Sequence, residues 1–313
     1  MVRTPTQDQL LQPLDQAAFR APVKRLDAKP LFPLVSLLAL PAAIWLALFT
    51  LAPLLLTVVM SFWKSTIFGT TTTLSWDNYQ RFFSDPLYGR VLLKTLRVAV
   101  LTTIFCLIVS YPVAWYLASQ NVAKKAVLLV AVFIPFWVSY IIRTFVWLPI
   151  LGRTGVINQF LQYLGLIDAP INWLLYSEFT LYIGLIYVYL LYMLLPIFLS
   201  LDKLDRKLLE AASDLGASPF QMFMRVVLPL STPGIISGSV MVFLLSCGAY
   251  VTPQILGGPS AIMFGNLIAE QFIGASNWAF GAMLSVIFIV VVLLVLALIG
   301  KKAGMQKIFL GQG

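Results

Sequence analysis

Long runs of apolar residues, interrupted by short charged segments, make up most of this chain. A helix needs roughly 20 predominantly apolar residues to cross the hydrocarbon core of a bilayer, where its backbone must satisfy its own hydrogen bonds. The predicted spans are Leu34–Met60, Val98–Ala123, Ala126–Ile142 with a continuation to Ile150, Phe179–Leu201, Gly234–Thr252 and Trp278–Gly300. The pattern therefore predicts an all-α membrane protein with about six transmembrane helices.

The polar segments at the two ends set the predicted domain boundaries. Residues 1–30 are polar and rich in proline, and we expect them to form a solvated tail. Residues 31–303 form the predicted transmembrane domain, and residues 304–313 form a second tail. A cleaved signal peptide is the less favoured interpretation of the first apolar run, because this run is much longer than the core of a signal peptide.

Composition excludes most soluble and catalytic alternatives. Of the 313 residues, 60% are hydrophobic and only 11% are charged, with a mean hydropathy of +0.92, which excludes a soluble enzyme. The chain has no histidine, so histidine-based catalysis and histidine metal sites are excluded as well. Cys106 and Cys247 lie in apolar runs and are expected to be buried thiols rather than a disulfide. We therefore predict no catalytic residues, no metal and no cofactor.

Basic residues predict how the chain is oriented in the membrane. The net charge of +9 would suggest a nucleic-acid partner in a soluble protein, but here the placement of the charges favours membrane lipid and no nucleic acid. With the N-terminus in the cytoplasm, fourteen of the 21 Lys and Arg residues fall on the cytoplasmic side. Both termini are therefore predicted to be cytoplasmic. Five tryptophans fall near the predicted outer ends, as expected for an aromatic belt: Trp63, Trp76, Trp147, Trp173 and Trp278.

The predicted cytoplasmic segment between spans four and five, residues 202–229, has the signals of a folded structure. Apolar residues recur at helical spacing up to Gly216, which suits a left-handed helix cap. Ser218, Pro219 and Gln221 then match the start of a second helix with a capping box. We call this helix–turn–helix segment the elbow. It would either carry motion from a cytoplasmic partner into the membrane or lie on the membrane surface as an ordinary amphipathic loop.

A motif within the elbow resembles the signature of permease subunits of bacterial ABC importers. In that signature, Glu-Ala-Ala is followed by three residues, a Gly, nine residues and Ile-x-Leu-Pro. The matching residues here are Glu210, Ala211, Ala212, Gly216, Leu228 and Pro229, with Val226 in place of the Ile. The resemblance implies a type I ABC importer permease fold in which the elbow is a coupling helix that docks on an ATP-hydrolysing subunit. The chain has no phosphate-binding loop of its own, so we expect a transport subunit without an ATPase site.

Five segments carry a further resemblance: Phe83–Arg90, Ile134–Trp147, Leu201–Ser218, Leu230–Phe243 and Tyr250–Pro259. Through these segments the chain, from about the second span onward, is most similar to the spermidine/putrescine branch of these permeases. The resemblance implies an ATP-driven importer in a bacterial inner membrane that takes up a small organic solute, with a polyamine as the first candidate. The implied partners are a second homologous permease, two cytoplasmic ABC ATPase subunits and a periplasmic substrate-binding protein. The alternatives are a permease for another small organic solute and an ion-coupled secondary transporter, although no carboxylate lies in the middle of a predicted span.

Candidate residues of the translocation path are Arg143, Tyr250 and Gln254. Arg143, near the outer end of span three, is either an interfacial anchor or a charge in the cavity. Tyr250 and Gln254 either line the path or pack between helices, and Glu270, in a predicted outer loop from Gly257 to Asn277, either contacts the binding protein or faces water. Gly234 and Gly238 form a G-x-x-x-G pattern that would allow a close helix approach, for example between two permeases.

Overall fold

The computed structural model describes residues 32–66 and 69–302, and the chain divides into two compact units, residues 1–54 and 55–313. The polar tails predicted for residues 1–30 and 304–313 lie outside the described residues. The described part of the first unit is one apolar helical run. It comprises α1 (Phe32–Leu46), the π-helical turn η3 (Ala47–Leu51) and the beginning of α2 (Ala52–Ser61). Its candidate membrane span, Ala39–Ser61, agrees with the first predicted span.

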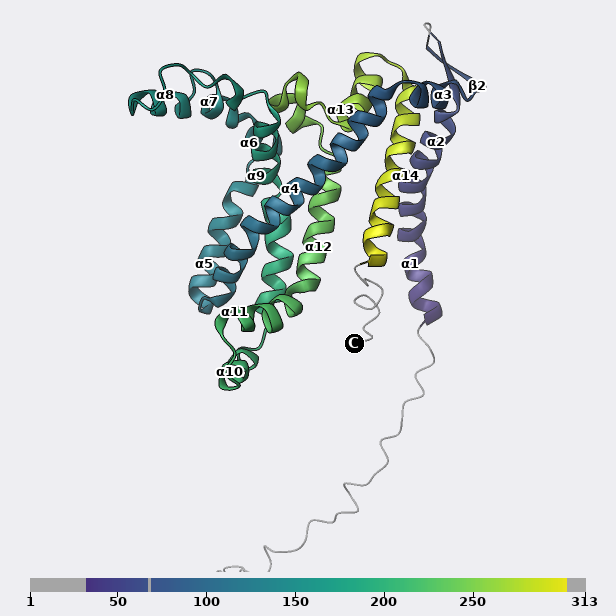
Figure 1. Ribbon diagram of the computed structural model, residues 1–313. Helices are drawn as coiled ribbons and strands as arrows, with labels where there is room; N and C mark the ends of the chain where they lie inside the picture. Colours follow the sequence, from purple (N-terminus) through teal and green to yellow (C-terminus); the bar gives the residue numbers. More distant parts are fainter. Residues whose placement is uncertain (1–31, 67–68, 303–313) are drawn as a thin grey trace, which may run out of the picture. The chain divides into compact units, whose positions relative to one another are not determined.

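The second unit is almost entirely helical (Figure 1). It begins with the remainder of α2, which is followed by an antiparallel hairpin of β1 (Trp63–Thr66) and β2 (Gly69–Leu74). The helices outside the elbow include α3 (Asp77–Ser84), α4 (Pro86–Ser119), α5 (Val122–Phe133), α9 (Glu178–Asp202), α12 (Leu228–Cys247) and α14 (Trp278–Lys302). The helices of the elbow are α10 (Arg206–Asp214) and α11 (Pro219–Met222). The shorter elements are η4 (Ile134–Trp137), α6 (Tyr140–Phe145), α7 (Trp147–Leu151), α8 (Val156–Tyr163), η5 (Asn172–Leu174), η6 (Phe223–Val227), η7 (Pro253–Gly257), η8 (Pro259–Ala261), α13 (Phe264–Ala269) and η9 (Glu270–Gly274).

Six helices among the described residues are long and apolar enough to cross a membrane, as the sequence predicts. The fourth and sixth predicted spans coincide with α9 and α14. The second span differs, because α4 begins at Pro86 and ends at Ser119 instead of running from Val98 to Ala123. Asp85 caps its first turn by accepting from the Leu87 backbone N–H, and the chain turns at Gln120 before Asn121 caps α5.

The third predicted span is wrong as a single helix. α5 ends at Phe133, and the 3₁₀ turn η4 and an extended Val138 separate it from α6. Pro135 is the physical reason, since it has no backbone N–H to donate and its ring clashes with the carbonyl four residues earlier in a helix. Figure 1 shows α5 beside one half of α9 and α6 beside the other, whereas α7 and α8 run across the end. The candidate span in this region is Tyr140–Tyr163.

The fifth predicted span is displaced toward the elbow. It was expected between Pro233 and Pro253, but the candidate span is Pro219–Cys247 and Pro233 lies inside α12. Proline is tolerated there because neighbouring groups in a membrane bundle satisfy the freed backbone carbonyls. The helix ends at Cys247, and Gly248 follows as its C-cap.

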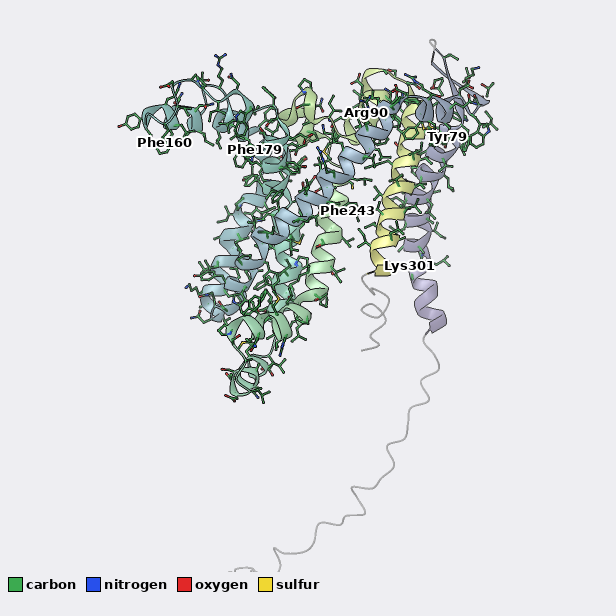
Figure 2. All side chains as sticks on the ribbon, in the orientation of Figure 1. Tyr79, Arg90, Phe160, Phe179, Phe243 and Lys301 are labelled. Atoms are coloured by element: carbon green, nitrogen blue, oxygen red, sulfur yellow. The ribbon has the colours of Figure 1, made fainter. Side chains whose placement is uncertain are left out.

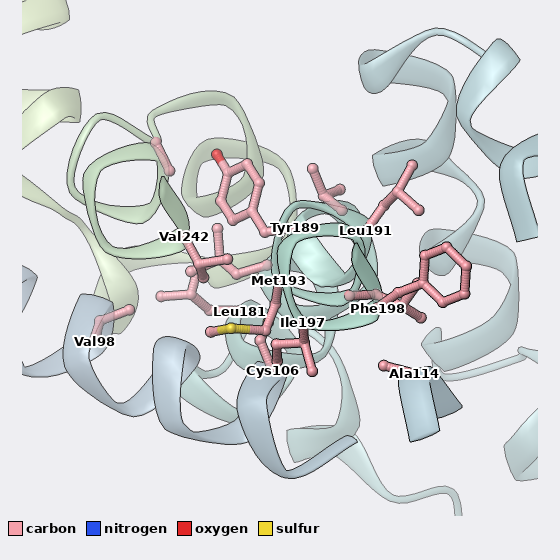
Figure 3. Packing of buried hydrophobic residues seen from close by; sticks show 14 of the residues in the cluster. Val98, Cys106, Ala114, Leu181, Tyr189, Leu191, Met193, Ile197, Phe198 and Val242 are labelled. Atoms are coloured by element: carbon pink, nitrogen blue, oxygen red, sulfur yellow. The ribbon is translucent and has the colours of Figure 1, made fainter. Parts of the chain in front are cut away.

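The core of the second unit lies where α9 packs between α4 and α12 (Figure 3). The largest cluster of buried apolar side chains joins these three helices, with Val98, Cys106, Met193, Ile197 and Val242 among its members. Gly234 and Gly238 of α12 face Pro196 and Met193 of α9. The close approach predicted from the glycine pattern is therefore confirmed, but it joins two helices of one chain rather than two permeases. Cys106 and Cys247 are free, buried thiols, as predicted.

The two ends of this bundle have different chemistry. Arg90 and Phe179 lie at the end that carries the hairpin and α13, and this end is opposite to α10 (Figure 2). There, Glu178 at the start of α9 pairs with Lys94 at 3.5 Å and with Arg97 at 2.8 Å, which joins α4 to α9. Between the ends, large apolar side chains are exposed along α4, α12 and α14. Such a surface is stable only against lipid or another apolar chain.

Candidate functional site

The elbow has the helix–turn–helix structure that the sequence predicts. Asp205 caps α10, accepting at 3.0 Å from the backbone N–H of Lys207. Gly216 ends the turn with a φ of +80°, a conformation that residues with a side chain rarely adopt. The backbone N–H of Ala217 donates to the carbonyl of Ala212 at 3.1 Å, which closes the end of α10. The turn is therefore defined by hydrogen bonds.

The second helix of the elbow begins with the predicted capping box. The backbone N–H of Gln221 donates to the Ser218 hydroxyl at 3.3 Å, and the backbone N–H of Ser218 donates to Gln221 Oε1 at 3.0 Å. Pro219 follows at the first helical position. Through the π-helical turn η6, α11 continues into α12, so the elbow is connected without a flexible break to a membrane-spanning helix.

Much of the elbow's surface is apolar and exposed. Leu215 and Phe220 are 89% and 68% exposed, and Glu210 and Ala211 are exposed on α10. Leu228 is half-buried and Pro229 is exposed at the start of α12. Between the two helices is a hollow of about 270 Å³. It is lined by Ala212, Leu215, Gly216, Ala217, Gln221, Met222, Arg225 and Val226. This surface can accept an apolar projection from a partner protein.

The elbow also adjoins the end of the bundle. A groove of about 420 Å³ lies there, and Glu210 and Leu209 of α10 form one wall of it. Trp115 and Ser119 of α4 and Lys125 of α5 line the same groove. Lys125 forms an ion pair with Asp202, the last residue of α9. α10 therefore borders the same groove as the ends of α4, α5 and α9.

At the opposite end of the bundle, Tyr250 and Gln254 line one pocket. The pocket has a volume of about 570 Å³ and lies between the end of α12 with η7 and the pair α13 and η9. Glu270 lines it too, although the sequence placed this residue in an outer loop. The segment from Gly257 to Asn277 is in fact mostly helical. Asn266 also lines the pocket but was not among the predicted residues. It lies four residues before Glu270, a spacing that places both side chains on one face of a helix.

Arg143 is not among the residues that line this pocket. It lies on α6, is only 8% exposed, and its guanidinium is 4.7 Å from the centre of the Phe136 ring. Its Nε and Nη1 atoms have no hydrogen-bond partner within residues 32–66 and 69–302, and neither has Nε1 of Trp147, four residues later. A buried cation with unpaired donors is costly unless a further group accepts its hydrogen bonds.

Comparisons with known proteins agree with this architecture. Residues 99–304 match the family described as binding-protein-dependent transport system inner membrane component. The chain is 38% identical to the spermidine/putrescine transport system permease protein PotB of Escherichia coli K12, over 80% of this chain and 91% of that protein. It is 34% identical to the inner membrane ABC transporter permease protein YdcU of the same organism, over 86% and 89% of the two chains.

A solved structure shows the same fold. The crystal structure of a bacterial ABC transporter involved in the import of the acidic polysaccharide alginate contains a chain similar to this one, with a TM-score of 0.65 and 18% identity. The similarity covers 87% of this chain and 95% of that chain. Because the identity is only 18%, the similarity shows the fold alone. This fold is the expected type I importer permease fold.

Proposed function

Because this chain belongs to the family of binding-protein-dependent transport system inner membrane components, we propose that it moves a polyamine across the membrane when a separate subunit hydrolyses ATP. The chain is a multi-pass inner-membrane permease of an ABC importer. Its relatives are transport subunits, which are not enzymes. Permeases of this kind work with ATPase subunits and a periplasmic binding protein, and we propose a second homologous permease as a further partner.

The elbow is the observation that carries the proposed coupling. Its capped helices, exposed Leu215 and Phe220 and hollow between α10 and α11 suit docking in a groove of the ATPase. Glu210 lies at the groove between α10 and the bundle, and Ala211, Ala212 and Gly216 allow a close approach. Leu228 and Pro229 connect the elbow to α12. When the ATPase subunits close, the elbow moves as one body and α12 moves with it.

The proposed orientation places the elbow and both termini in the cytoplasm. The basic residues Lys124, Lys125, Lys207 and Arg225 gather on the elbow side of the second unit. The pocket around Tyr250 and Gln254 then opens toward the periplasm, where a loaded binding protein docks. Transport follows alternating access: ATP binding favours one state of the permease pair and hydrolysis returns it to the other.

The proposed substrate is spermidine or putrescine, because the chain is 38% identical to spermidine/putrescine permeases over most of its length. Arg143, Tyr250 and Gln254 remain the proposed residues of the path. Other small organic solutes are the alternative substrates, and an ion-coupled secondary transporter is the alternative mechanism.

The experiment is to co-express the chain with its neighbouring permease and ATPase genes, purify the complex and reconstitute it with the binding protein. We expect polyamine-loaded binding protein to stimulate ATP hydrolysis and ATP to drive polyamine uptake. A Glu210→Ala variant should assemble but lose most of the stimulation, whereas the matched Asp168→Ala variant, far from the elbow in sequence, should keep it. Polyamine uptake driven by an ion gradient without ATP would contradict the proposal.

A further inference from the structure

The pocket around Tyr250 and Gln254 is built from two segments that a side-chain hydrogen bond joins. Asn266 of α13 donates from its Nδ2 atom to the backbone carbonyl of Tyr250 at 2.8 Å. Its Oδ1 atom accepts from the backbone N–H of Met263 at 3.1 Å. Gly265 supports the same contact, since a Cβ at this position would lie 3.0 Å from the carbonyl oxygen of Ala249. The two walls of the pocket are therefore fixed relative to each other.

Glu270 supplies the charge in this pocket. It follows Asn266 by four residues on the same helical run and is the single Asp, Glu, Lys or Arg residue among those that line the pocket. In the part of the chain that the structure describes, its carboxylate makes no ion pair, whereas Glu178 at the same end of the bundle is paired twice. Gly274 lies directly beside this carboxylate, and a Cβ at that position would displace the flexible end of the Glu270 side chain.

The remaining lining is mostly apolar or aromatic. Tyr250 contributes a ring, Gln254 an amide, and Pro253, Ile262 and Ile273 contribute aliphatic surface. One carboxylate beside an aromatic ring and aliphatic side chains suits a ligand that joins a cation to a hydrocarbon chain. An inorganic oxyanion would be repelled by the Glu270 carboxylate.

We propose that Glu270, together with Tyr250 and Gln254, binds one protonated amino group of an aliphatic amine on its way through the importer. The ammonium group lies at the Glu270 carboxylate, and the methylene chain packs on Tyr250, Ile262 and Ile273. This inference rests on the proposed import function and names the part of the solute that this chain contacts. Asn266 and Gly274 are positioning residues, because they hold the wall and leave room for the carboxylate.

The test uses cysteine protection in the assembled permease–ATPase complex. Ile273 lines the pocket and is 78% exposed, so an Ile273→Cys variant should react readily with a maleimide, while the native Cys106 and Cys247 are buried. We expect putrescine to slow this labelling and neutral 1,4-butanediol to leave it unchanged. Adding Glu270→Gln should weaken the protection by about tenfold or more, the loss expected when a charged hydrogen bond is removed.

Two controls make the labelling result specific. A Val156→Cys variant carries an exposed thiol on α8 outside the pocket, and its labelling should not respond to putrescine. Asp168→Asn removes another exposed outer carboxylate and should leave the protection of Ile273→Cys intact. Glu270→Asp should retain part of the protection because it keeps the charge.

Uptake measurements separate this inference from the proposed function. Putrescine protection that is absent, or that persists unchanged in Glu270→Gln, overturns the amine site even when the wild-type complex imports polyamines. Conversely, protection that depends on Glu270 in a complex that imports no polyamine supports the site and refutes the proposed substrate. If the wild-type complex shows neither putrescine protection nor polyamine uptake, the amine site and the proposed function are both refuted.

Discussion

Gly234 of α12 lies against the backbone of Pro196 in α9, and a methyl group on Gly234 would overlap the Pro196 carbonyl oxygen. One turn further along α12, a methyl group on Gly238 would lie 2.9 Å from the sulfur of Met193. The two helices therefore approach each other at distances that only glycine permits. This contact places α12, and with it the elbow, in a fixed position on α9.

We expect Gly234→Val to destabilise the protein by about 1–3 kcal/mol, because the added atoms meet the backbone of α9 and not only a movable side chain. Thermal unfolding of the purified chain in detergent measures this loss. Gly248→Ala is the matched control, since its new methyl group would meet its nearest neighbours at 3.7 and 3.9 Å, an ordinary contact. Equal melting temperatures for the two variants would contradict the close approach.

Gly216→Ala should strain the elbow, because its φ of +80° costs a residue with a side chain about 1–2 kcal/mol. We expect reduced stimulation of the ATPase with normal membrane insertion. Gly165→Ala is a close match, since Gly165 has a φ of +68° and both positions have open space around the new methyl group. If the Gly165 variant loses as much stimulation, the effect is general strain and the elbow is not the coupling element.

The ion pair between Lys125 and Asp202 offers a test by charge exchange. Asp202→Lys should lower stability by up to about 1 kcal/mol, because the pair is partly exposed and the variant places two cations together. Adding Lys125→Asp should restore the melting temperature, since each charge then also suits its helix end: an anion in the first turn of α5 and a cation at the end of α9. If the two substitutions lower the melting temperature additively, the ion pair contributes nothing to stability.

Arg143 should be more important for transport than for folding. Arg143→Met removes two buried donors that have no acceptor within the described residues, so the melting temperature of the isolated chain should stay equal or rise. In the assembled complex, we expect transport to fall by about tenfold or more, as for the loss of a charged hydrogen bond. Arg153→Met, an exposed basic residue ten positions away, is the control and should leave both quantities unchanged. A large drop in stability of the isolated chain would contradict this role.

The elbow could be predicted almost completely from the sequence, because its structure depends on neighbours along the chain. Ser218 and Gln221 satisfy each other's backbone groups across one turn, and Gly216 supplies the conformation that ends α10. The positions of α9 and α14 were equally predictable, since uninterrupted apolar runs of this length have one stable state in a bilayer.

Helix boundaries were less predictable where distant residues satisfy polar groups. The second span was predicted to begin at Val98, directly after Arg97, yet α4 begins at Pro86 and Arg97 pairs with Glu178, 81 residues later in the chain. Pro233 seemed to mark the start of a span, but α12 continues through it. For Arg97, a partner that lies far away in the sequence therefore lowers the cost of a charge near the membrane.

The sequence by itself determined the number of spans, the elbow and the family motif, because apolar length and local capping are properties of consecutive residues. Only the tertiary structure decided that Glu270 lies in one pocket with Tyr250 and Gln254, and that Gly234 and Gly238 serve the contact between α12 and α9. The physical reason is that the lining of a pocket and the approach of two backbones depend on atoms from separate helices. Their positions are set by packing of the whole bundle.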